Sequence, residues 1–110
     1  MESRQSLMCG AAAALLLSLV VGCVSVGAEF PVQRVPALRV GETTRDEVQR
    51  VFGEPWRTGL EDGQRTWTYG EYHLSAFGGA HARDLVVRFD DRGVVSSYSF
   101  NSTYPEDAEL

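Results

Sequence analysis

A short helix that cannot stand alone is the feature that most constrains this fold. In the stretch "VGETTRDEVQRVFGEP", Thr44 can cap the first free amides while Glu47 reaches back to complete a capping box. Gly53 and Pro55 supply the stop signal. The sequence therefore predicts a helix from about Arg45 to Phe52. A helix of this length is marginal in water, so it must pack on another layer.

Three later segments carry strand signals, because each is rich in β-branched or aromatic residues and alternates in polarity. They are Thr66 to Tyr72, Arg83 to Phe89 and Val94 to Phe100. The Asp62-Gly63 turn signal joins the first of them to a short strand around Trp56 to Leu60. These segments predict an antiparallel meander.

The apolar faces of helix and sheet can then be paired. Helical spacing places Val48, Val51 and Phe52 on one stripe. Strand alternation predicts an inner sheet face made of Trp67, Tyr69, Leu85, Val87, Phe89, Val94, Tyr98 and Phe100. It places Val95 on the outer, polar face, and Trp56 is assigned to the core. The expected fold class is α+β: a short helix, preceded by at most one helical turn near Pro36 to Arg39, on a three-stranded antiparallel sheet.

The N-terminal part has a different character. Leu7 to Val21 is almost uninterrupted Leu, Ala and Val, about 15 residues long, shorter than the roughly 20 that a spanning helix needs. A buried helix is the alternative, but the rest of the chain is too small to wrap a helix that is apolar on all sides. Residues 1–22 are therefore predicted to be a signal peptide.

Val20-Val21-Gly22-Cys23 resembles a bacterial lipobox, in which a small residue precedes a cysteine whose thiol carries diacylglycerol. The resemblance implies that Cys23 is the lipidated first mature residue and anchors the protein to a membrane. Cys9 follows the bulky Met8 and does not fit, so it is expected to leave with the signal, and no disulfide can form. Val24, rather than Asp, follows the cysteine, and the resemblance to sorted enterobacterial lipoproteins then implies transfer to the outer membrane, with the domain on the periplasmic face.

The expected organisation is a signal peptide at 1–22, a lipidated tether at 23–36, a folded domain at 37–102 and a frayed acidic tail at 103–110. Pro31 and Pro36 argue against a long helix in the tether. All ten basic residues are arginine and the net charge is −5, so nucleic acid is not an expected partner. Loss of Glu2 and Arg4 with the signal leaves that net charge unchanged.

The order "LRVGETTRDEVQRVFGEP", "WTY" and "LVVRFDDRGVVSSYSF" behind a lipobox resembles the SmpA/OmlA (BamE-like) family of small outer-membrane lipoproteins, over about residues 37–100. The resemblance implies a helix on a three-stranded sheet, no catalysis, and service to the assembly of outer-membrane proteins. The lipid-headgroup role in that family involves a basic residue where this chain has Gly70-Glu71-Tyr72. Glu71 would repel a phosphate rather than pair with it.

Motifs for catalysis or metal binding are missing from the sequence. His73 and His81, near Glu71 and Asp84, are separated by eight residues rather than by the tight spacing of known zinc sites. Exposed loop histidines are the expectation, with no metal and no cofactor. The sequence contains no nucleophile elbow, phosphate loop or zinc-protease motif, so the protein is expected not to be an enzyme.

The segment "HLSAFGGAH" is the candidate partner contact. Leu74 and Phe77, with the neighbouring Tyr72, place large apolar groups beside Gly78-Gly79 in a predicted loop. Exposed aromatic groups often anchor partners. Alternatively, Phe77 folds back to cap the sheet.

Two functions follow from these observations. The first is a lipid-anchored, non-catalytic adaptor in outer-membrane protein assembly or envelope integrity. The second is a tethered binding or inhibitor module, because β-lactamase inhibitor proteins are built from similar units.

Overall fold

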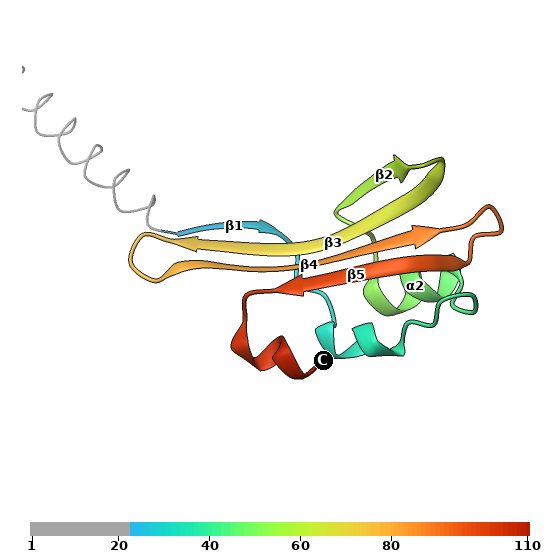
Figure 1. The fold of residues 1–110 in the computed structure, drawn as a ribbon. Coiled ribbons are helices and arrows are strands. Elements are labelled where there is room, and N and C mark those ends of the chain that lie inside the picture. Colours follow the sequence, from blue (N-terminus) through green and yellow to red (C-terminus); the bar gives the residue numbers. More distant parts are fainter. Residues whose placement is uncertain (1–22) are drawn as a thin grey trace, which may run out of the picture.

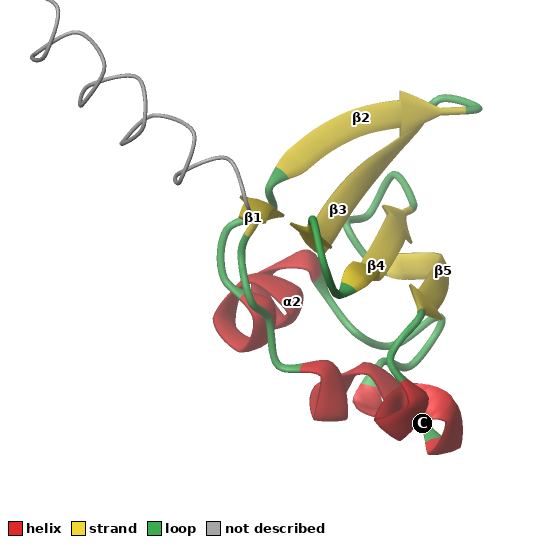
Figure 2. Cartoon of the chain, turned by 90° about the vertical axis from the view of Figure 1, so that its left-hand side faces the viewer, coloured by secondary structure: helices red, strands yellow, loops and turns green. Residues whose placement is uncertain are grey.

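The computed structural model describes residues 23–110, so the expected signal peptide at 1–22, with Cys9, lies outside the described residues. Its elements, in chain order, are β1 (Cys23–Gly27), η2 (Val32–Ala37), α2 (Arg45–Phe52), β2 (Arg57–Glu61), β3 (Gln64–Ser75), β4 (Gly79–Phe89), β5 (Val95–Ser102) and η3 (Pro105–Glu109). α2 and η2 lie on one side of a single antiparallel sheet, and the opposite side is open (Figures 1 and 2). The α+β expectation is confirmed.

The sheet is larger than expected, with five strands instead of three. Its order is β1-β3-β4-β5, and β2 also pairs with β3. β1 pairs with residues 71–75 of β3 and β2 with residues 64–68, so the two short strands lie end to end along the same edge of β3 (Figure 1). The β3–β4 ladder runs from Arg65↔Phe89 to Ser75↔Gly79 and is the longest strand pairing of the sheet.

α2 has the predicted bounds and the predicted caps. The Thr44 hydroxyl accepts a hydrogen bond from the Glu47 amide at 3.3 Å, and the Gly53 amide donates to the Gln49 carbonyl at 2.8 Å. Val48 and Phe52 are buried against the sheet, whereas Val51 is exposed. The expected three-residue stripe is therefore wrong at Val51.

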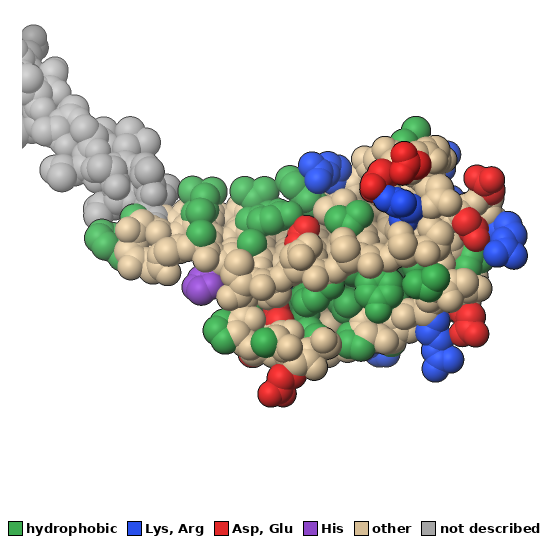
Figure 3. Space-filling model, in the orientation of Figure 1, with side chains coloured by type: hydrophobic (Ala, Val, Ile, Leu, Met, Phe, Trp, Pro, Cys, Tyr) green, Lys and Arg blue, Asp and Glu red, His purple; other side chains and the backbone are tan. Residues whose placement is uncertain are grey.

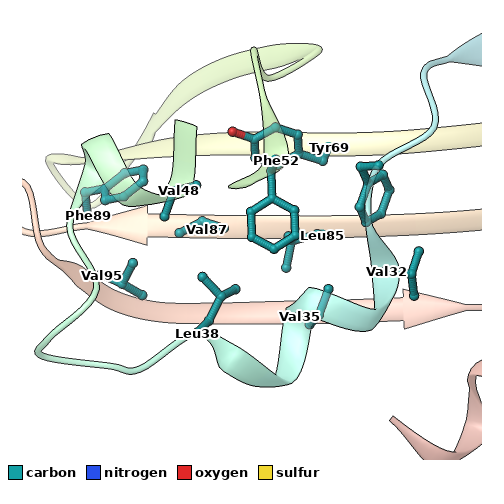
Figure 4. Close-up of a cluster of buried hydrophobic side chains, with 11 residues drawn as sticks. Val32, Val35, Leu38, Val48, Phe52, Tyr69, Leu85, Val87, Phe89 and Val95 are labelled. Carbon is teal, nitrogen blue, oxygen red and sulfur yellow. The ribbon is translucent and has the colours of Figure 1, made fainter. Parts of the chain in front are cut away.

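The core lies between the sheet and the helical layer (Figure 4). It consists of Phe30, Val32, Val35, Leu38, Val48, Phe52, Tyr69, Leu85, Val87, Phe89 and Val95, with Trp67, Tyr98 and Phe100 packed against it. The phenol of Tyr69 donates to the Gly53 carbonyl at 2.9 Å, which ties β3 to the end of α2. Burial, with a smaller contribution from the nearby Glu54 charge, raises the pKa of Tyr69 far above its usual range.

In β5, the expected assignment of Val94 and Val95 to the two faces of the sheet is wrong. A bulge near Arg88 and Phe89 pairs Phe89 with Val95 and Arg88 with Ser97, so β5 carries one extra residue. This extra residue moves Val95 to the inner face, where it is fully buried, while Val94 precedes the strand. The expected core position of Trp56 is also wrong, because this residue is half exposed.

The expected tether is part of the fold. Residues 23–27 form β1, and Phe30, Val32 and Val35 are buried in the core. η2 also starts earlier than the turn expected near Pro36 to Arg39. Extended pairing and a 3₁₀ helix tolerate the prolines that exclude a long α-helix here. The folded part of the described chain therefore begins at residue 23 instead of 37.

The acidic tail is likewise ordered. η3 covers Pro105–Glu109, and its Asp107 carboxylate accepts hydrogen bonds from Arg83 on β4 and from the Ser102 hydroxyl. Within residues 23–110, no helix combines the length and the apolar character needed to cross a bilayer.

Candidate functional site

Strand register brings the sequence-predicted residues to one end of the sheet. Cys23 lies opposite Ser75, Val24 opposite Leu74, and Val26 opposite Tyr72. The sequence alone could not give this juxtaposition, because residues 23–26 were expected in a tether. Cys23 is exposed at the start of β1.

The open face at this end carries an apolar strip. We define the apolar strip as Val24, Val26, Trp56, Tyr72 and Leu74. Val24, Val26, Trp56 and Leu74 are all at least 42% exposed, although they are large hydrophobic residues. Figure 3 shows hydrophobic side chains along β1 and the adjoining part of β3. No described element covers this side of the sheet (Figure 2).

Tyr72 is the best packed member of the strip. Its ring lies over Gly70, where an added Cβ would come within 2.8 Å of the ring carbons. It meets Trp56 edge-on, with ring centroids 6.4 Å apart. Gly70 and Trp56 therefore fix the Tyr72 ring on the sheet, and its half-buried state follows from them.

The predicted loop is mostly a hairpin. β3 and β4 stay paired through His73↔His81, Leu74↔Ala80 and Ser75↔Gly79, which leaves only residues 76–78 as the turn. Phe77, in this turn, is 99% exposed, so it does not fold back to cap the sheet. The Ser75 hydroxyl accepts hydrogen bonds from the amides of Phe77 at 3.3 Å and Gly78 at 3.1 Å. The turn is thus held by its own hydrogen bonds.

A polar cluster occupies the covered side of the same hairpin. Arg83 donates from Nη1 to Glu71 Oε1 at 3.1 Å, and from Nε to Asp107 Oδ2 at 2.6 Å. Its guanidinium also lies 4.0 Å from the centroid of the Tyr104 ring. The hydrogen bond to Asp107 is the main reason that the pKa of Arg83 is raised, and the same bond lowers the pKa of Asp107.

Glu71 belongs to this cluster and not to an exposed anion-repelling surface. Glu71 is only 5% exposed, and its carboxylate pairs with the Arg83 guanidinium. His73 lies beside it, with Nε2 3.9 Å from Glu71 Oε1 and Nδ1 2.9 Å from the Ser25 hydroxyl. His81 stacks on Tyr104 instead. Among residues 23–110, no three His, Cys, Asp or Glu side chains are grouped so as to hold a metal ion.

Sequence reasoning missed three of the residues that build the strip. Val24 and Val26 were placed in the tether, and Trp56 was placed in the core. The alternation Cys-Val-Ser-Val at 23–26 is the strand signal that could have identified β1. Contact between Trp56 and Tyr72 has no such signal, because it depends on where β2 joins the edge of β3.

Comparison with known proteins agrees with this architecture. A search of curated proteins found no match. A family model described as "Outer membrane protein assembly factor BamE domain" matches residues 27–99, which is well over half of the chain. Its range begins at the end of β1 and includes η2, α2 and the β2–β4 region together with most of β5. The chain therefore belongs to the BamE family.

Proposed function

We propose that this protein is a lipid-anchored, non-catalytic accessory factor in outer-membrane protein assembly, held at the periplasmic face of the outer membrane through Cys23. The family match over residues 27–99 is the observation that carries the assembly role. The lipobox sequence and the exposure of Cys23 support the anchor. Several acyl chains on one residue would make this attachment effectively permanent.

The non-catalytic role agrees with what the described side chains do. Arg83 is engaged by two carboxylates, those of Glu71 and Asp107, and these ion pairs pin η3 to the sheet. The exposed apolar strip and Phe77 instead offer a surface for contact with a membrane or a partner. A protein that works by contact needs such a surface and needs no reactive group.

Mass spectrometry of the protein purified from its own envelope tests the anchor. The expected product begins at Cys23 and carries diacylglycerol and a further acyl chain. An unmodified product, or one that begins elsewhere, would contradict the anchor.

A matched pair of cysteine variants tests the same point in cells. Cys23→Ser removes the acceptor thiol, so the domain should lose its acyl chains and leave the outer-membrane fraction. Cys9→Ser should behave as wild type, because this cysteine is expected to lie in the signal. A Cys23→Ser protein that remains in the outer membrane would overturn the proposal.

Affinity capture from solubilised envelope tests the role. Recovery of outer-membrane assembly subunits with the wild-type protein is expected. Recovery of a soluble hydrolase alone would favour the tethered inhibitor.

A further inference from the structure

The tip of the β3–β4 hairpin and the strand β1 beside it carry no formally charged side chain. Residues 23–28 and 72–82 contain no Asp, Glu or Arg, and the whole protein has no Lys. These residues form β1, the end of β3 and the start of β4. Charged side chains gather chiefly at the opposite end of the molecule (Figure 3). A surface of this kind loses little hydration energy when it leaves water.

The same end presents large apolar groups on an ordered frame. Phe77 is 99% exposed at the tip, and Val24 and Leu74 follow it on paired positions of β1 and β3. Because the Ser75 hydroxyl binds the two amides of the turn, Phe77 is presented by a fixed hairpin. Burial of these side chains would therefore require little further ordering of the chain.

The membrane anchor would lie beside this tip. Cys23 pairs with Ser75, two residues from Phe77, and neighbouring antiparallel strands are about 5 Å apart. No spacer separates residue 23 from the sheet, since β1 begins there. Any attachment of residue 23 to a bilayer therefore brings the hairpin tip to the same surface. This step uses the proposed anchoring at Cys23.

We infer that the apolar strip and Phe77 form a second membrane contact, in which the hairpin tip enters the hydrocarbon of the bilayer. The occupant is acyl chain rather than headgroup phosphate, because residues 23–28 and 72–82 contain no Arg or Lys, and Arg83, the first cation after them on β4, is already paired with Glu71 and Asp107. The acidic remainder of the domain would be kept out of an anionic surface by repulsion. α2 and the polar end then point toward the periplasm.

A pair of tryptophan reporters tests this contact. Phe77→Trp and Leu60→Trp each replace an exposed hydrophobic residue, the first at the hairpin tip and the second on β2 at the far end of β3. Each variant is isolated from the envelope with its natural processing and is reconstituted into vesicles of phosphatidylethanolamine and phosphatidylglycerol with brominated acyl chains. Wild-type emission from Trp56 and Trp67 is subtracted.

The tip reporter should lose most of its emission to the bromines, shift to shorter wavelength and resist quenching by aqueous iodide. The Leu60→Trp reporter should stay open to iodide and unaffected by bromine. Equal iodide access at both positions would overturn the inference. Protection of position 77 only after solubilised envelope proteins are added would also overturn it, in favour of a protein partner.

The two proposals fail separately. If mass spectrometry shows no acyl chains on Cys23 but the tip reporter is quenched by bromine, the anchor is wrong and the hydrocarbon contact stands. If Cys23 is acylated and position 77 remains open to iodide, the anchor stands and the hydrocarbon contact is wrong.

Discussion

Arg83 and Asp107 form a two-point contact, in which Nε donates to Oδ2 at 2.6 Å and Nη2 donates to Oδ1 at 3.2 Å. The two residues are 24 positions apart, and their contact fixes η3 against β4. The forked guanidinium matches the carboxylate geometry, so this pair is stronger than a single surface ion pair. Both side chains are largely shielded from water, at 19% and 7% exposure.

Arg83→Met should lower the free energy of unfolding by about 2 kcal/mol, because it leaves the shielded carboxylates of Glu71 and Asp107 without a cation. Urea denaturation followed by circular dichroism measures the change. Arg39→Met is the control, since its pair with Glu42 is largely exposed to solvent and should contribute little. Equal stability of the two variants would show that the cluster does not hold the fold.

Acidification should weaken the same contact. The hydrogen bond from Arg83 lowers the pKa of Asp107 below its ordinary value of 3.8. A lowered carboxyl pKa stabilises the fold above the unfolded value, and this contribution is lost as the pH falls through the folded value. Urea midpoints of wild type should therefore fall below about pH 4. Asp107→Asn should be less stable at pH 7 and should show a smaller acid loss, whereas an unchanged acid slope would exclude this role.

Tyr69→Phe should cost about 1 kcal/mol of unfolding free energy, because it removes the hydrogen bond to the Gly53 carbonyl and keeps the ring. The ring contacts with Phe52 and Phe30, at centroid distances of 5.5 and 6.2 Å, should survive. Tyr69→Ala removes both and should cost several times more. Similar losses for the two variants would mean that the hydroxyl is the main contribution.

Gly27→Ala should displace the end of β1. Gly27 has a φ of +84°, and an added Cβ would lie 2.0 Å from the Gly70 carbonyl oxygen. Gly41→Ala is the matched control, because its φ is +82° but nothing lies within 4 Å. The control should cost about 1 kcal/mol from backbone strain alone, and the Gly27 variant clearly more. Hydrogen exchange at the amides of β1 should rise only in the Gly27 variant.

Local signals account for the parts of the fold that the sequence predicted. α2 was placed with its bounds because capping box, apolar spacing and stop signal all lie within the segment. Leu85, Val87 and Phe89 were likewise assigned to the inner face by alternation alone, and all three are buried. The bulge that exchanges Val94 for Val95 depends on pairing with β4, so no local pattern contains it.

The missed parts depend on distant partners or on a less familiar period. Val32, Val35 and Leu38 recur every three residues, which is the 3₁₀ repeat and differs from the i, i+3, i+4 spacing of an α-helix. The order of the tail depends on Arg83, which the chain brings near only after β4 and β5 pair. For the candidate site, the exposure of Leu74 and Phe77 was foreseen, while their closeness to Cys23 required the β1–β3 register.

The end-to-end arrangement of β1 and β2 also affects the tendency of the protein to aggregate at high local concentration. One edge of the sheet is formed by two strands of five residues each instead of one long strand. Short, interrupted borders are poor templates for a strand from a neighbouring molecule. Copies concentrated in a thin layer of the envelope would therefore resist stacking through this border into aggregates.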